Sequence, residues 1–173
     1  MEQKADFPEP PANSAVAMAV DEKGYLGTGY DGTNYLNDFW EFNPTTNTWA
    51  QKADFPGSGR YGAVAFGVNG KAYIGCGYDG NYLKDFYAFN PAANSWTQTI
   101  SIGGTKRQGA TSFVINGIAY VCCGQNKRRI CRRFLGNSIP ARNHGPNLGI
   151  YRIPRTRIMT MIIRSHVRTG LLS

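Results

Sequence analysis

The chain has 173 residues, of which 42% are hydrophobic and 13% aromatic, so it carries enough apolar material for a folded core. Its formal net charge of +8 would favour a nucleic-acid partner if the charge were evenly spread. Residues 127–173, however, contain 11 basic residues and no acidic one, whereas residues 1–126 contain 8 basic and 11 acidic residues. The basic character therefore belongs to the C-terminal segment, and no apolar stretch has the length of a membrane span.

Two similar units, and the first half of a third, follow one another along the chain. The segment DFWEFNPTTNTW at residues 38–49 becomes DFYAFNPAANSW at residues 85–96. The third unit begins at residues 107–124, which repeat the pattern of residues 60–77. A period of about 47 residues indicates an array of supersecondary units, each of which needs its neighbours to bury a core.

The second unit shows the expected strands most clearly. Residues Tyr61–Val68 are small or β-forming and predict a first strand, and Asn69–Gly70 is a strong hairpin signal. The return strand is expected at Lys71–Gly77, a third strand at Asp85–Asn90 and a fourth at Ser95–Thr99. Because no helical periodicity accompanies them, these segments predict an all-β fold with four short antiparallel strands per unit.

Several features recur in register from one unit to the next. They are an apolar strand that ends in paired glycines (YIGCG in the second unit), aromatic residues in the third strand (Phe39–Trp40 and Phe86–Tyr87), and a tryptophan in the fourth (Trp49 and Trp96). Over residues 1–126 this pattern resembles the Kelch family. The resemblance implies a partial β-propeller built from four-stranded antiparallel blades. Since such propellers close with more blades than two and a half units supply, we expect the chain to be a fragment of a larger propeller protein.

The resemblance divides the chain into five segments. Residues 1–8 are expected to be the remnant of a preceding blade strand, 9–56 the first Kelch repeat and 57–103 the second. Residues 104–126 match half of a third repeat, and residues 127–173 are expected to be a disordered basic tail outside the propeller.

The basic tail begins where the second half of the third repeat should follow. Codons compatible with Lys127–Leu135 read KGGYVDDFW after the deletion of one base, and one further deletion continues the unit as EFNPGTEPWTEL. We therefore interpret the tail as the product of two single-base insertions, in which case Cys131, His144 and His166 serve no site. The alternative is a genuine divergent tail.

Two cysteines occupy one position of the repeat. Cys76 and Cys123 stand where the first unit has Thr28, which predicts a small-residue position in a strand. Because neighbouring strand residues point to opposite faces, Cys122 and Cys123 are not expected to share a ligand. The spacings do not match those of metal sites, so we expect buried free thiols and neither a metal nor a cofactor.

The order of strands in a blade places two loops on the same side of each unit. They are the loop that enters the first strand, at residues 57–62, and the loop between the second and third strands, at residues 77–85. Arginine and tyrosine side chains suit the recognition of polar ligands through bidentate contacts and ring stacking. The candidate ligand-binding residues of this face are Arg60, Arg107, Tyr30, Asp31, Tyr78 and Asp79.

Each of these residue types also has a structural interpretation. The aspartates of the face can cap their own glycine-rich turns, and the arginines can brace neighbouring blades. Asp38 and Asp85, which open the third strands, are expected to hold turn amides rather than a ligand. The pairs Tyr35–Leu36 and Tyr82–Leu83 either cover a blade edge or offer a surface to a partner.

The function that the resemblance implies is binding or scaffolding of a protein or a glycan, without catalysis by this chain. One alternative is a piece of a carbohydrate-active Kelch enzyme, of the sugar-oxidase or sialic-acid-epimerase type, although residues 1–126 contain no histidine. Another is nucleic-acid binding by the basic tail, which would depend steeply on salt. The compartment is not predicted, although the resemblance is compatible with a secreted or periplasmic parent protein.

Overall fold

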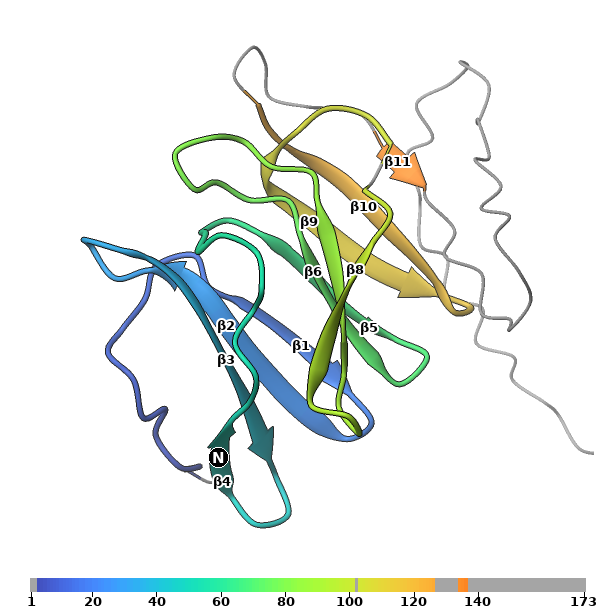
Figure 1. The fold of residues 1–173 in the computed structure, drawn as a ribbon. Coiled ribbons are helices and arrows are strands. Elements are labelled where there is room, and N and C mark those ends of the chain that lie inside the picture. Colours follow the sequence, from blue (N-terminus) through green and yellow to red (C-terminus); the bar gives the residue numbers. More distant parts are fainter. Residues whose placement is uncertain (1–2, 102, 127–133, 137–173) are drawn as a thin grey trace, which may run out of the picture.

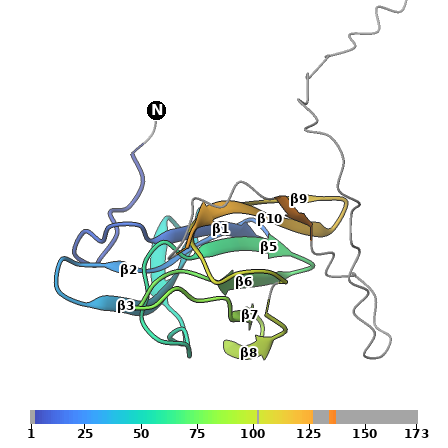
Figure 2. The ribbon, with the colours of Figure 1, turned by 90° about the horizontal axis from the view of Figure 1, so that it is seen from above.

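The computed structural model describes residues 3–101, 103–126 and 134–136, which form three antiparallel β-sheets. The sheets lie side by side in chain order, and contacts between their first strands join each sheet to the next (Figure 1). Figure 2 shows the same arrangement from above, where β5 to β8 follow one another across the second sheet. The described residues contain no helix, and hence none that could span a membrane.

The strands follow the four-strand order that the repeats predict. The first sheet consists of β1 (Val16–Val20), β2 (Lys23–Tyr30), β3 (Tyr35–Asn43) and β4 (Thr48–Gln51). The second sheet consists of β5 (Val64–Val68), β6 (Lys71–Gly75), β7 (Phe86–Asn90) and β8 (Ser95–Thr99). The third sheet consists of β9 (Gln108–Ile115), β10 (Ile118–Gln125) and β11 (Phe134–Gly136). Each strand pairs with its sequence neighbour, so each sheet is a meander, as in a propeller blade.

Hairpin turns with positive φ connect the first two strands of the second and third sheets. Asn69 and Gly70 have φ values of 52° and 68°, and Asn116 and Gly117 have φ values of 51° and 72°. Asparagine and glycine tolerate this left-handed conformation, which matches the right-handed twist of the flanking strands. The structure therefore confirms the hairpin expected at residues 69–70.

The strand boundaries in the second sheet differ from those predicted. β5 begins at Val64 instead of Tyr61, and β6 ends at Gly75 instead of Gly77. Cys76 has a φ of 56°, and a left-handed residue interrupts the regular ladder. Thr28 and Cys123, at the same repeat position, also have positive φ values of 56° and 61° but lie within β2 and β10, so the predicted strand position is confirmed for them and is wrong only for Cys76.

A strand also forms within the segment expected to lie outside the propeller. Residues 134–136 form β11, which pairs with β10 and gives the third sheet its third strand. The expectation of a wholly disordered tail is therefore wrong at these residues. The edge of β10 that is not paired with β9 offers main-chain donors and acceptors, and any extended segment can pair with it, whatever its side chains. The rest of residues 127–173 lies outside the described residues.

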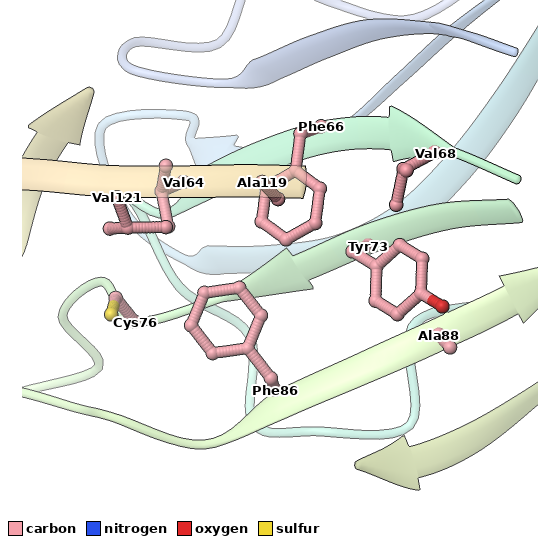
Figure 3. Close-up of a cluster of buried hydrophobic side chains, with 9 residues drawn as sticks. All are labelled: Val64, Phe66, Val68, Tyr73, Cys76, Phe86, Ala88, Ala119 and Val121. Atoms are coloured by element: carbon pink, nitrogen blue, oxygen red, sulfur yellow. The ribbon is translucent and has the colours of Figure 1, made fainter. Parts of the chain in front are cut away.

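The sheets dock on each other through faces of two kinds. We call the face directed at the next sheet in the chain the trailing face, and the face directed at the previous sheet the leading face. The trailing face of the second sheet carries bulky buried residues, among them Phe66, Tyr73 and Phe86, and the leading face of the third sheet covers them with Ala119 and Val121 (Figure 3). Between the first and second sheets Tyr25 and Phe39 likewise meet Ala63, Ala72 and Ile74. Small or aliphatic residues thus take part in both contacts, and at the first contact Tyr25 and Phe39 also meet the Phe89 ring of the second sheet, at 6.0 and 4.9 Å between ring centroids.

A tryptophan joins each of the first two sheets to the short segment that precedes it in the chain. Trp49 Nε1 donates to the Ala5 carbonyl at 3.1 Å, and Trp96 Nε1 donates to the Ala53 carbonyl at 2.8 Å. The phenylalanine two residues later in each segment packs on the same tryptophan, as Phe7 does at 5.1 Å between ring centroids. Residues 4–8 therefore pack on the first sheet, which follows them in the chain.

Candidate functional site

The two loops predicted to share a side of the blade do lie together. Tyr61 and Tyr78 exchange main-chain hydrogen bonds of 3.1 and 2.9 Å, which join the loop before β5 to the loop after β6. The loop before β5 also reaches the first sheet, because the Gly29 amide donates to the Arg60 carbonyl at 2.7 Å. The corresponding bond one repeat later runs from the Gly77 amide to the Arg107 carbonyl at 2.8 Å. Main-chain bonds thus hold the loops of neighbouring blades in one continuous surface.

Five tyrosines gather on this surface, and we call them the tyrosine patch. Tyr30, Tyr35 and Tyr61 form a triangle with ring centroids 5.3 to 6.1 Å apart, and Tyr35 lies nearly parallel to Tyr61. Tyr78 contacts Tyr61 at 5.6 Å and Tyr35 at 6.3 Å, and Tyr82 extends the group from Tyr78 at 5.2 Å. The patch therefore spans loops of two blades.

The sequence predicts part of this patch. Tyr30 and Tyr78 are among the candidate ligand-binding residues, the pairs that contain Tyr35 and Tyr82 are assigned either to edge cover or to a partner surface, and Tyr61 is not predicted. Tyr35 and Tyr82 could be noticed because both units contain the same local sequence, Asn-Tyr-Leu, around them. Tyr61 has no aromatic counterpart in the other units, where Asn13 and Gln108 stand, so the repeat pattern alone could not indicate it.

Tyr35 is the most accessible ring, with 38% of its surface exposed. Partial desolvation raises the pKa of the Tyr35 phenol, and the neighbouring Tyr78 and Tyr61 act in the same direction. The hydroxyl therefore stays neutral at physiological pH and can both donate and accept a hydrogen bond. The Tyr30 hydroxyl, by contrast, is already hydrogen-bonded within the loop, where it donates to the Gly32 carbonyl at 2.7 Å.

The two aspartates beside the patch organise their own turns. Asp31 Oδ1 accepts hydrogen bonds from the amides of Thr33 and Asn34 at 2.7 and 2.6 Å, and Asp79 Oδ1 accepts one from the Asn81 amide at 3.0 Å. The bonds from Asn34 and Thr33 lower the pKa of Asp31. The turn-capping interpretation is thus confirmed in both loops, and contact of these carboxylates with a ligand stays a prediction.

Arg60, one of the predicted ligand-binding residues, is buried, and its contact with a ligand stays a prediction. The side chain is fully buried, and its guanidinium lies over the Phe55 ring at 4.7 Å. Nη1 donates to Asp85 Oδ1 at 2.8 Å and to the Cys76 carbonyl at 3.0 Å, and Nη2 donates to Asp85 Oδ2 at 2.9 Å. The arginine therefore braces the loops of its own blade, whereas sequence analysis expected it either at a ligand or between blades.

Arg107 occupies the equivalent place in the third unit and is also buried, with 1% of its surface exposed. Nη1 donates to the Cys123 carbonyl at 2.9 Å, which repeats the bond from Arg60 to Cys76. Among the described residues, the structure records no carboxylate bonded to Arg107. Contact of Arg107 with a ligand, like that of Arg60, stays a prediction.

The first unit has the aspartate of the Arg60–Asp85 pair but lacks the arginine. Asp38 matches Asp85, but Ala12 stands at the position of Arg60. Asp38 Oδ2 accepts a hydrogen bond from Trp40 Nε1 at 3.0 Å, and Oδ1 is buried with no hydrogen-bond partner among the described residues. Burial raises the pKa of the Asp38 carboxyl, against the lowering effect of the Trp40 bond. The prediction that both carboxylates hold turn amides is therefore wrong, because one binds a guanidinium and the other an indole.

The cysteines differ in accessibility. Cys76 and Cys122 are buried, as expected for free thiols, whereas Cys123 is exposed and Cys131 lies outside the described residues. Burial raises the pKa of the Cys76 thiol to about 12, so this thiol is unreactive in the folded chain. Within the part of the chain that the structure describes, no three His, Cys, Asp or Glu residues are grouped closely enough to hold a metal.

A family model described as the KLHDC2/KLHL20/DRC7 Kelch-repeats domain matches residues 2–129. The chain belongs to the Kelch-repeat family. Its fold agrees with this assignment, since each described sheet is an antiparallel meander of the kind that forms a propeller blade.

A solved structure supports the same fold. The structure of YjhT superimposes with a TM-score of 0.61 and 26% sequence identity, covering 72% of this Kelch-repeat chain. The chain spans only 37% of the length of that structure. A search of the curated proteins found no match.

Proposed function

We propose that this Kelch-repeat chain is a recognition module that binds an extended segment of a partner protein on the tyrosine patch and carries no catalysis of its own. The single observation that supports this best is the contact network of Tyr35 with Tyr30, Tyr61 and Tyr78 on a surface fixed by main-chain bonds. Kelch-repeat domains generally bind proteins, which favours a peptide over other ligands.

Tyrosine suits such a surface for physical reasons. The ring buries a large apolar area at a low cost in side-chain entropy, and the hydroxyl supplies a polar contact, so tyrosines are enriched among the residues that dominate binding energy. In the patch, ring contacts hold the side chains in place before the ligand arrives. This preorganisation reduces the entropy that binding would otherwise lose.

A glycan is the second candidate, and the turn aspartates favour it. Asp31 is exposed beside the tyrosine rings, and carboxylates next to aromatic faces can bind the hydroxyl groups and the apolar face of a sugar. A peptide and a glycan would bind the same surface, so the same variants test both ligands.

The test is a selection with the full chain on two probes, a displayed library of random peptides and an array of immobilised glycans. Binders are then measured against Tyr35→Ala, with Ile100→Ala as the matched control, because Ile100 is 65% exposed and is absent from the patch contacts. We expect Tyr35→Ala to weaken binding about tenfold, which corresponds to about 1.4 kcal/mol. Binders that Tyr35→Ala leaves unaffected would refute the proposal.

The catalytic and nucleic-acid alternatives rest on other parts of the chain. Residues 1–126 contain no histidine, so copper-dependent sugar oxidation would need ligands from residues that the repeats do not supply. Nucleic-acid binding would rest on residues 127–173, and it predicts binding to a DNA oligonucleotide that falls steeply with salt and is lost when those residues are removed.

A further inference from the structure

The second unit shows how a blade of this chain holds a guanidinium group. The Arg60 guanidinium donates to the two carboxylate oxygens of Asp85 at 2.8 and 2.9 Å and to the Cys76 carbonyl at 3.0 Å. It also lies over the Phe55 ring at 4.7 Å. Gly57 leaves room for the group, because a Cβ at this position would lie 2.6 Å from Arg60 Nη2.

The first unit has the partners of the guanidinium but not the arginine. The equivalent residues are Phe7, Thr28 and Asp38, with Ala12 in place of Arg60. The surrounding packing is equivalent too, because Trp40 meets the Phe7 ring edge-to-face at 5.7 Å. Its counterpart Tyr87 meets the Phe55 ring in the same way at 5.0 Å.

The main chain holds position 12 as it holds Arg60. The residue after position 12, Asn13, exchanges main-chain hydrogen bonds of 2.8 and 3.0 Å with Tyr30. The residue after Arg60, Tyr61, exchanges bonds of 3.1 and 2.9 Å with Tyr78. A side chain at position 12 therefore starts from the equivalent point of the blade, but alanine is too short to reach the aspartate.

One carboxylate oxygen in the first unit consequently lacks the donor that its counterpart has. Asp38 Oδ1 is buried and has no hydrogen-bond partner among the described residues, whereas Oδ2 accepts the Trp40 bond. No ion pair of Asp38 is present in that part of the chain either. A buried acceptor without a donor is unfavourable, so a cation that donates to Oδ1 would be favoured there.

The charge around Asp38 also favours a cation. Glu9 stands where the second unit has Gly57, so the first unit carries an additional carboxylate at the entrance of the site. Burial raises the pKa of Asp38, and the negative charges of Glu9 and Asp54 act in the same direction. Both of these carboxylates are exposed, and they would attract a positively charged side chain from solution.

We propose that Phe7, Thr28 and Asp38 form a binding site for the guanidinium group of an arginine side chain supplied by a partner. The incoming group donates to Asp38 Oδ1 and to the Thr28 carbonyl, and it lies over the Phe7 ring. Arginine suits the site better than lysine, because its planar fork can donate in two directions while its face covers an aromatic ring. This site does not depend on ligand binding by the tyrosine patch.

The test titrates the full chain with N-acetyl-L-arginine amide, and N-acetyl-L-lysine amide is the matched control probe. NMR spectroscopy with isotope-labelled tryptophan follows the indole N–H of Trp40, which is bonded to Asp38. The Trp96 indole, which is bonded to the Ala53 carbonyl, is the internal reference. We expect the arginine derivative to shift the Trp40 resonance and not that of Trp96, and the lysine derivative to bind about tenfold more weakly.

Two variants locate the bound group. Asp38→Asn keeps an acceptor for Trp40 but removes the charge, and it should weaken binding of the arginine derivative about tenfold or more. Ala12→Arg supplies the missing arginine within the chain, so it should shift the Trp40 resonance without any probe and abolish binding of the probe. Ala92→Arg, in the exposed turn between β7 and β8, adds the same charge elsewhere and should leave binding unchanged.

Circular dichroism checks that each variant keeps its strands, and Asp38→Asn decides alone if Ala12→Arg does not fold. A Trp40 resonance that the arginine derivative leaves in place in the parent chain would overturn the proposal. Binding that persists unchanged in Asp38→Asn, or in a folded Ala12→Arg chain, would overturn it as well.

Discussion

Arg60 holds Asp85 by two parallel hydrogen bonds, from Nη1 to Oδ1 at 2.8 Å and from Nη2 to Oδ2 at 2.9 Å. The same guanidinium donates to the Cys76 carbonyl, and so joins the loop before β5 to both ends of the loop between β6 and β7. A bidentate pair of this kind fixes geometry as well as charge. The loops that carry Tyr61 and Tyr78 are therefore positioned by an ion pair in which the Arg60 side chain is buried and the Asp85 side chain is 24% exposed.

Removal of one partner of this pair should destabilise the fold strongly. Asp85→Ala leaves the fully buried Arg60 guanidinium without a counter-charge, which typically costs about 3 kcal/mol or more. Asp38→Ala, at the same position of the first unit, removes a carboxylate that has no arginine partner, and it should cost about 1 kcal/mol or less. Urea unfolding of both variants measures the difference, and equal losses would contradict this role of the pair.

The carboxyl of Asp38 should make stability depend on pH in the direction opposite to that of an ion-paired aspartate. Because burial raises its pKa in the folded chain, the folded state binds the proton more tightly than the unfolded state does. The stability that the Asp38 carboxyl contributes is therefore present at pH values below its ordinary pKa, and it is lost as the pH rises through the raised pKa. Asp38→Asn keeps an acceptor for Trp40 and removes this dependence. We expect the stability of the variant relative to the parent, measured by urea titration, to increase between about pH 3 and about pH 7. A difference that stays constant over this range would contradict the raised pKa of Asp38.

Thiol labelling should separate the cysteines of one repeat position. Cys123 is exposed and should react with iodoacetamide in the folded chain, whereas Cys76 should react only after unfolding, because it is buried and its pKa is raised to about 12. Peptide mass spectrometry assigns each labelled site and keeps Cys131 separate. Rapid labelling of Cys76 under native conditions would show that the loops around Arg60 open readily.

A glycine in β5 permits the close approach of the first two sheets. A Cβ at Gly67 would overlap the Ala19 carbonyl oxygen and contact Val20 of the first sheet. Gly67→Ala should therefore cost about 2 kcal/mol through overpacking. Val114 stands at the same repeat position in β9 with 38% exposure, so Val114→Ala is the control and should cost less. Unfolding midpoints that shift equally would contradict the close approach.

The parts of the structure that the sequence predicted depend on the main chain and on turn residues. The repeat register indicated the meander of β5 to β8 and the turn at Asn69–Gly70, because glycine and asparagine at fixed positions dictate those turns. The meander also placed the two loops on one side. The Arg60–Asp85 pair was not predicted, because a contact across 25 residues depends on side-chain packing that one sequence does not reveal. The strand β11 was missed because its pairing depends on the free edge of β10 and not on its own side-chain pattern.

The most direct test of the tyrosine patch is NMR spectroscopy of the full chain with isotope-labelled tyrosine rings, titrated with a peptide or glycan selected as described above. We expect shifts for the patch rings and none for the four other described tyrosines, which lie outside the patch. The patch rings are Tyr30, Tyr35, Tyr61, Tyr78 and Tyr82, and the other described tyrosines are Tyr25, Tyr73, Tyr87 and Tyr120. Shifts confined to these four tyrosines, with the patch unchanged, would show that recognition takes place elsewhere.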